Sequence, residues 1–323
     1  MSQVRPGTFA LSLLSAPLNV QLLEALERDR KSLRDLRRAA GAPSPTTMRK
    51  QLTALSDLEV LIRHQQAEFP GGVEFELGPA GVELLEITRL LQNWLADSPE
   101  GPMAIGSTLA KNALKALVEG WNTKIVRALA ARPLSLTDLN RLISAFNYPY
   151  LERRFSALRL CGLIEPTPVE EGRGRGTLYG ASRWLQQACG PLMAAAQWER
   201  RHAADRIAGE RFDFEAAFLL GALGRTLSAD ANGRCRLGVE LRNGSGEAAL
   251  AGVQLQVVEG EIRSCVARPE GNADASASGP SSAWVRTLMS GRPDELYLSG
   301  DRHLALEVVE SLHRELFRAQ QPV

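Results

Sequence analysis

The stretch Ser32-Leu33-Arg34-Asp35-Leu36 decides the fold, because it recurs 103 residues later as Ser135-Leu136-Thr137-Asp138-Leu139. The same offset, without a gap, aligns further identical residues: Asn19 with Asn122, Ala25-Leu26 with Ala128-Leu129, Arg38 with Arg141, Ala42 with Ala145, and Ala54-Leu55 with Ala157-Leu158. Matches that keep one register over such a distance indicate an internal repeat. We therefore interpret residues 9–97 and 112–202 as two copies of one module.

The first copy carries the signals of three helices, a β-hairpin and a closing helix. Leucines at helical spacing and serines suited to N-capping mark the helices. A Pro-Gly-Gly turn between two extended runs marks the hairpin. Pro45 is expected at the first position of the third helix, where its missing N–H costs nothing. The elements are expected at residues 18–26, from Ser32, from Ser44, at 61–69 and 73–77, and from Pro79.

The second copy follows the same order of elements. Its second helix is expected to begin after Ser135, and its third helix is expected to span residues 148–161. Two extended runs, at 163–170 and 177–180, flank the glycine- and arginine-rich loop at 171–176. Three helices, a hairpin and a closing helix are the elements of a winged helix-turn-helix. The sequence therefore predicts two winged-helix modules in tandem.

Over about 185 residues that include both copies, the sequence resembles the HxlR type of winged-helix regulator, within the wider group of the MarR and PadR types. The residues that carry the resemblance are Ser32–Leu36, Ser44-Pro45, Leu55 with Leu58, Leu77-Gly78-Pro79-Ala80-Gly81, Trp94 and Ala196–Glu199. Gly78 replaces the threonine of the family's pattern. Members of this family usually act as homodimers that place two third helices in successive major grooves. Because one chain holds both copies here, the resemblance implies an intramolecular pseudo-dimer.

Exposed residues of the two third helices, together with the second hairpin, are the candidate DNA contacts. A winged helix reads base edges with its third helix and binds phosphates with helix N-termini and the hairpin. The candidates are Ser44, Thr46, Thr47, Arg49, Lys50, Tyr148, Tyr150, Arg153, Arg154, Arg173 and Arg175. The alternative interpretation is that these basic residues only solvate an exposed helix face and a flexible turn.

The charge distribution favours the second copy as the stronger DNA binder. Residues 118–202 carry 12 Lys and Arg against 7 Asp and Glu. The corresponding counts are 10 against 12 for residues 14–97 and 13 against 17 for residues 203–323. A positive balance suits a polyanionic partner. Acidic residues also surround the first hairpin, so we expect the first copy to bind DNA less firmly, with two unlike half-sites.

The last third of the chain has a different pattern, with alternating short strands followed by two helices. Strands are expected at 236–240, 249–258, 261–267 and 274–278, and helices at 281–290 and 301–317. The segment from Ala273 to Ala305 resembles the sterol carrier protein type 2 fold, in which an α/β layer covers a hydrophobic tunnel. The resemblance implies a lipophilic ligand, whereas the alternative is a domain for association or packing.

The expected fold class is mainly α with α+β. Winged-helix modules at residues 1–98 and 99–205 form the pseudo-dimer, and an α+β domain follows at 206–323. Aromatic residues are the ligand-binding candidates: Trp94, Trp121, Trp198, Phe212, Phe214, Phe218 and Trp284. They could line an aromatic cleft for a flat apolar ligand, although aromatic residues at these spacings more often fill a core.

Composition limits the function classes. No stretch approaches the ~20 apolar residues that span a membrane, and the N-terminus lacks a convincing secretory signal. The four cysteines have no CxxC spacing and are expected to be free thiols of a reducing compartment. We therefore expect a cytoplasmic monomer or homodimer, without a membrane partner, cofactor or metal.

The function predicted from the sequence is DNA-binding transcriptional regulation tuned by a small lipophilic or aromatic effector. The alternative is a self-resistance type of protein that sequesters a ligand and has kept the winged-helix architecture without DNA binding. The four histidines are scattered, and the sequence offers no pairing of nucleophile and base and no metal-ligand cluster. We therefore do not expect an enzyme.

Overall fold

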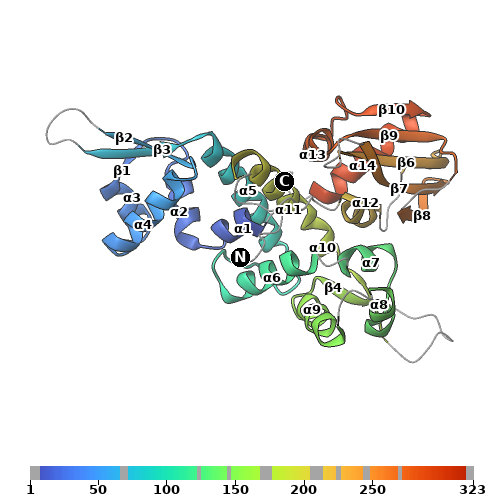
Figure 1. Ribbon diagram of the computed structural model, residues 1–323, viewed down its shortest axis with the longest axis horizontal. Coiled ribbons are helices and arrows are strands. Elements are labelled where there is room, and N and C mark those ends of the chain that lie inside the picture. The colour runs from blue at the N-terminus through green and yellow to red at the C-terminus, as the bar shows by residue number, and fades with distance from the viewer. Residues whose placement is uncertain are drawn as a thin grey trace. The chain divides into compact units, whose positions relative to one another are not determined.

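The computed structural model in Figure 1 describes residues 8–65, 72–121, 125–143, 147–167, 177–203, 214–222, 227–242, 248–267 and 271–317. The chain divides into two compact units. Unit 1 comprises residues 1–97, 101–114 and 191–211, and unit 2 comprises residues 98–100, 115–190 and 212–323. This division differs from the predicted boundaries at residues 98 and 205. The closing helix of the second copy packs in unit 1, and the C-terminal domain shares unit 2 with most of the rest of the second copy.

Unit 1 contains the first copy, whose elements follow the predicted order. They are α1 (Thr8–Leu14), α2 (Pro17–Ala25), β1 (Lys31–Ser32), α3 (Leu33–Ala39), α4 (Pro45–Ser56), β2 (Leu61–Gln65), β3 (Val73–Leu77) and α5 (Pro79–Ala96). The strands form an antiparallel sheet in the order β1-β3-β2. Leu36, Met48 and Leu55 are fully buried and fix α3 and α4 in the core.

The predicted N-caps set the beginnings of α3 and α4. The Ser32 hydroxyl accepts a hydrogen bond from the Asp35 amide at 3.3 Å, and the Ser44 hydroxyl accepts one from the Thr47 amide at 3.1 Å. Such caps satisfy amide groups that have no partner within the helix. Pro45 occupies the first turn of α4, as predicted.

Gly78 has a packing reason to stand where the family pattern has threonine. A Cβ atom at this position would lie 2.4 Å from the carbonyl oxygen of Glu59, far inside van der Waals contact. The Gly78 amide also donates a hydrogen bond to the carbonyl of Val60 at 3.0 Å. The junction between the hairpin and α5 is therefore too close to the end of α4 for a larger residue.

The second copy has a similar order of elements, and its second and third helices begin at the offset that the sequence predicts. The elements are α6 (Thr108–Trp121), α7 (Ile125–Ala131), α8 (Leu136–Leu142), α9 (Tyr148–Leu160), the antiparallel strands β4 (Ile164–Thr167) and β5 (Leu178–Ala181), α10 (Arg183–Gln187) and α11 (Cys189–His202). α8 begins 103 residues after α3, and α9 begins 103 residues after α4. Ser135 and Asp138 form a capping box at the start of α8, the counterpart of the Ser32 cap.

Backbone geometry repeats with the same offset. Glu59 and Gly162, which are 103 residues apart, both adopt a left-handed conformation, with φ of 56° and 71°. In each copy the following amide bonds back into the third helix, from Val60 to Leu55 at 3.0 Å and from Leu163 to Leu158 at 2.9 Å. A left-handed residue that ends a helix in this way is a Schellman type of C-cap.

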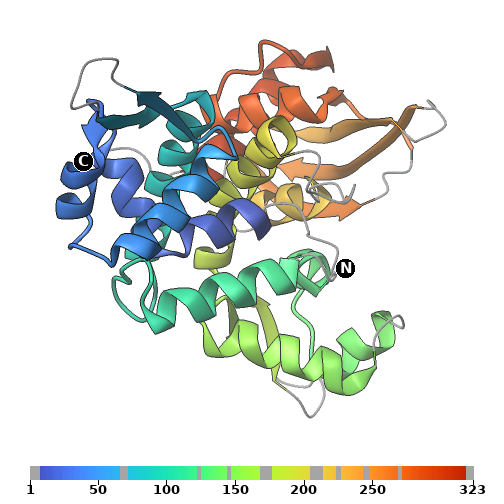
Figure 2. The ribbon, with the colours of Figure 1, turned by 60° about the vertical axis from the view of Figure 1, so that its left-hand side comes forward.

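The C-terminal domain is an α+β domain within unit 2. Its elements are α12 (Phe214–Ala222), β6 (Gly233–Arg242), β7 (Ala248–Val258), β8 (Glu261–Ala267), β9 (Ala275–Pro280), α13 (Ser281–Ser290), β10 (Tyr297–Gly300) and α14 (Arg302–Phe317). The sheet order is β10-β9-β6-β7-β8, with β6 and β9 parallel and the other pairs antiparallel (Figures 1 and 2). The three helices pack on this sheet. The two last helices were predicted, whereas α12 and β10 were not.

The structure agrees with a mixed α and β class. Within the described ranges, no helix combines the length and apolar character that a membrane span requires.

Candidate nucleic-acid interface

The outward face of α4 carries most of the predicted DNA contacts of the first copy. Met48 and Leu52 are buried against the module, so the residues between them turn outward. The exposed set comprises Ser44, Thr46, Thr47, Arg49 and Lys50. No ion pair is seen for Arg49 or Lys50 among the residues that the structure describes. Two unneutralised cations and two hydroxyl groups on one helix face can contact both phosphates and base edges.

Three exposed arginines of α3, the helix that precedes α4, add positive charge to this part of the module, and the sequence prediction missed them. Arg34, Arg37 and Arg38 are exposed around the single buried residue of the helix, Leu36. The Arg37 Nε atom donates a hydrogen bond to the carbonyl of Pro43 at 3.0 Å, which ties the turn between α3 and α4. The signal that the sequence offered was the clustering of three arginines around Leu36 on one short predicted helix.

A charged cluster lies at the base of the first hairpin. The Glu76 carboxylate accepts hydrogen bonds from the Arg30 guanidinium and bonds with His64 Nε2 at 2.6 Å. These partners, Arg30 first, hold the pKa of Glu76 below its usual value. One acidic residue of the first hairpin is therefore paired with two basic side chains. Arg63, which precedes His64 on β2, is exposed.

The third helix of the second copy differs from its counterpart. Tyr148 and Arg153 are exposed, and Tyr150 is partly buried. The prediction that Arg154 lies on the exposed face is wrong, because its side chain is only 15% exposed and forms an ion pair with Glu119 of α6. The Arg153 and Arg154 guanidinium groups also lie 5.6 and 5.1 Å from the centre of the Tyr150 ring, within cation–π range.

The remaining predicted DNA contacts, Arg173 and Arg175, lie outside the described residues. The same holds for Phe212 among the aromatic candidates, and for the side chain of Trp121.

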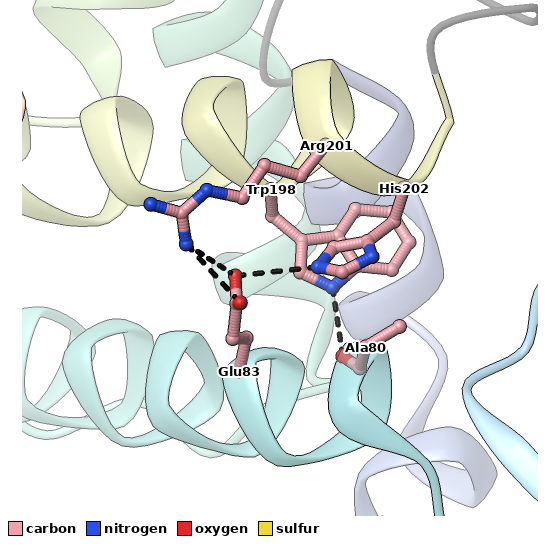
Figure 3. A network of polar contacts seen from close by, with 5 residues as sticks. All are labelled: Ala80, Glu83, Trp198, Arg201 and His202. Carbon is pink, nitrogen blue, oxygen red and sulfur yellow. Dashed lines mark hydrogen bonds and ion pairs between the residues drawn. The ribbon is translucent and has the colours of Figure 1, made fainter. Parts of the chain in front are cut away.

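The aromatic candidates of unit 1 are buried. Trp94 and Trp198 are each about 1% exposed. Figure 3 shows Trp198 of α11 facing α5, where its indole Nε1 donates a hydrogen bond to the Ala80 carbonyl at 2.8 Å. Beside it, Glu83 of α5 pairs with Arg201 at 3.1 Å and with His202 at 3.4 Å. These contacts join two helices of unit 1, and the packing that the sequence offered as the alternative accounts for them.

The aromatic candidates of the C-terminal domain also contact one another. The Phe218 ring lies 6.2 Å from Phe214 and 4.7 Å from Trp284, measured between ring centres. The Trp284 indole Nε1 donates a hydrogen bond to the Gly238 carbonyl of β6 at 2.8 Å. All three rings are buried, so they hold α12 and α13 on the sheet.

A hollow of about 360 Å³ lies elsewhere in unit 2. It is lined by residues of α7, the β4–β5 hairpin, α10 and α14, among them Leu129, Glu165, Arg183, Gln186 and Glu315. The predicted aromatic residues are not among its lining residues. Nowhere in the described part of the chain do three or more His, Cys, Asp or Glu residues group closely enough to hold a metal ion.

Comparison with known families matches one part of the chain. Residues 14–100 match the model of a family described as HxlR-like helix-turn-helix. The match runs from the end of α1 past α5 and includes the exposed basic residues of α3 and α4. This region is therefore similar to helix-turn-helix domains, which suggests a DNA-binding transcription regulator. The second copy and the C-terminal domain lie outside the matched residues. No curated protein matches the chain.

Proposed function

We propose that this protein is a cytoplasmic transcriptional regulator that binds duplex DNA through the α3–α4 face of its first module. The observation that carries the proposal is the basic face formed by Arg34, Arg37, Arg38, Arg49 and Lys50 within the matched helix-turn-helix domain. In this binding mode α4 enters the major groove, and Arg49 and Lys50 reach guanine edges or the flanking phosphates. The arginines of α3 lie beside it and bind the phosphate backbone.

The tandem arrangement is part of the proposal. The common offset of helices, caps and left-handed residues supports an origin of both copies from one winged-helix module. α11 is the closing helix of the second copy, as α5 is of the first, and Trp198 joins it to α5 within unit 1. This helix pair is the intramolecular equivalent of a dimer contact, so one chain has the architecture of a pseudo-dimer.

Effector control is a second part of the proposal, and the hollow in unit 2 is its best candidate site. The hollow is lined by both the second copy and α14, so a bound molecule would bias how these parts pack. Glu165, Arg183 and Glu315 place charged groups among its apolar lining residues. They favour a small effector that carries polar groups as well as apolar surface over the lipophilic one inferred from the sequence. A ligand screen by thermal shift, repeated with Glu315→Ala, tests this part.

The experiment that tests DNA binding is selection of sequences from a random duplex library, followed by affinity measurements at several salt concentrations. We expect enrichment of one sequence motif and an affinity that falls steeply with salt, because bound phosphates release counterions. A protein that sequesters a ligand without binding DNA gives no enriched motif and no salt-dependent DNA affinity, and that result would contradict the proposal.

A further inference from the structure

We infer that each chain reads DNA bases with the third helix of its first module alone, so one chain recognises a single major-groove half-site. This inference rests on the proposed DNA binding and specifies the kind of site that is bound. It reverses the expectation, drawn from total charge, that the second copy is the stronger binder.

The first argument compares the two third helices position by position. At the offset of 103 residues, Arg49 of α4 corresponds to Glu152 of α9, which is also exposed. Lys50 corresponds to Arg153, so the adjacent pair of cations in α4 becomes a pair of opposite charges in α9. A carboxylate that faces the groove repels phosphates and cannot accept a hydrogen bond from the acceptor edge of guanine. α9 therefore lacks the two-cation face that α4 presents.

The second argument concerns Arg154, the next cation along α9, whose side chain is mostly buried. Arg154 pairs with Glu119, and neither residue has a charged counterpart in the first copy, where Gln51 and Ala16 occupy these positions. The pair is a feature of the second copy only. An arginine that is 15% exposed and neutralised by a carboxylate cannot reach a base edge unless the pair breaks.

The third argument is the charge of the whole candidate face. On α3 and α4, five exposed cations stand against the single exposed acid Asp35. On α8 and α9, the accessible cations Arg141, Arg153 and Arg159 stand against Asp138 and Glu152. Arg141 lies 3.7 Å from Asp138, and Arg159 lies in the last turn of α9, away from the N-terminal half with which a recognition helix contacts bases.

The test uses two charge-matched double variants of the full chain, Arg49→Ala/Lys50→Ala and Arg153→Ala/Arg159→Ala. Each variant removes two exposed cations from one third helix, and circular dichroism checks that each stays folded. Affinity for the selected duplex is measured by fluorescence anisotropy. Guanine methylation interference counts the major-groove segments contacted by the wild-type protein, and native mass spectrometry counts the chains bound per duplex.

We expect the first variant to weaken specific binding by roughly 50-fold or more, since a good base contact is worth about 1–3 kcal/mol. The second variant should weaken it by less than about threefold, through lost long-range attraction. The number of clusters of guanines whose methylation prevents binding should equal the number of chains bound to the duplex. Two clusters for each bound chain, or equal losses in the two variants, would overturn the inference while leaving DNA binding intact. Failure of the wild-type protein to select any sequence would instead refute the proposed function.

Discussion

The indole Nε1 of Trp198 on α11 donates a 2.8 Å hydrogen bond to the carbonyl of Ala80 on α5, 118 residues earlier in the chain. The ring is about 1% exposed and stacks near Phe9, with 6.5 Å between ring centres. A backbone amide in the same region, that of Ala10, donates to the buried Glu199 carboxylate at 2.8 Å. These contacts place the closing helix of the second copy in the core of unit 1.

Trp198→Phe should destabilise unit 1, because it keeps most of the apolar contact and removes the indole donor. The loss of a buried hydrogen bond together with some packing should cost about 1–3 kcal/mol. Hydrogen exchange should rise in α5 and α11. Trp284→Phe is the matched control, since its indole bonds to Gly238 within unit 2 and its loss should raise exchange in α13 and β6. Identical exchange patterns in the two variants would disagree with the division into units.

The ion pair between Arg127 of α7 and Glu215 of α12 should hold the second copy and the C-terminal domain together in unit 2. Glu215 is 12% exposed and also accepts a hydrogen bond from the Gly252 amide at 3.2 Å. Arg127→Ala leaves this carboxylate buried without its cation and should cost about 2 kcal/mol, a value reduced because Arg127 is partly exposed.

Adding Glu215→Gln to Arg127→Ala should restore part of that loss. The neutral amide needs no cation, and its oxygen still accepts from Gly252. Denaturant unfolding of the two single variants and the double variant measures the coupling between the two positions. Strictly additive losses would show that the pair contributes no stability.

Glu76 should make the stability of the first hairpin depend on pH. Its pKa is lowered from the usual 4.5, first by the hydrogen bond from Arg30 and then by that from His64. A lowered folded-state pKa stabilises the fold above the unfolded pKa, and this contribution is lost as the pH falls through the folded pKa. The wild-type protein should therefore be more stable than Glu76→Gln at neutral pH, and the difference should vanish in acid.

Thermal melting of both proteins between pH 3 and pH 8 measures this difference. Glu86→Gln, which removes an exposed carboxylate from α5, is the control and should show no comparable trend. A stability difference that stays constant down to pH 3 would be inconsistent with the lowered pKa of Glu76.

The four free cysteines should react with iodoacetamide in an order set by burial. Burial raises the pKa of Cys235 to about 12 and also raises the pKa of fully buried Cys189. Because the thiolate is the reactive form, neither should be modified before the protein unfolds. Cys265 and Cys161 are partly exposed, so both should be modified before the two buried cysteines, even though burial raises the pKa of Cys161. Peptide mass spectrometry over time gives the order, and early labelling of Cys235 would contradict it.

The local elements of both copies could be predicted because their signals lie within a few residues. Ser32 and Ser135 each stand three residues before an aspartate and cap a helix. Pro45 lies in the first turn of α4, as expected. The repeat aligned each element with its counterpart in the other copy. A weak signal in one copy was therefore supported by a stronger signal in the other.

The orientation of charged side chains could not be predicted in this way. The pattern of apolar residues along α9 predicts an exposed side chain at Arg154. The partner that buries and neutralises it, Glu119, lies 35 residues earlier on another helix. Counting charges over residues 118–202 treated this neutralised pair as if its cation were available. That count led to the expectation that the second copy binds DNA more firmly, which our proposal reverses.

Long-range packing also lay beyond the sequence. Apart from Glu215, the segment Phe214–Ala222 is apolar, so it gives little amphipathic signal, and it is a buried helix rather than the lining of a pocket. The placement of α11 in unit 1 depends on the contact between Trp198 and Ala80, which no local pattern indicates.

The most direct test of DNA binding through α4 is the affinity of Arg49→Ala/Lys50→Ala for the duplex selected by the wild-type protein. The control is Arg292→Ala/Arg302→Ala, which removes the same charge from exposed positions of the C-terminal domain. Our account predicts that the α4 variant binds roughly 50-fold or more weakly and no longer distinguishes the selected sequence from random DNA, while the control stays within about twofold. Equal affinities of the two variants for the selected duplex would contradict it.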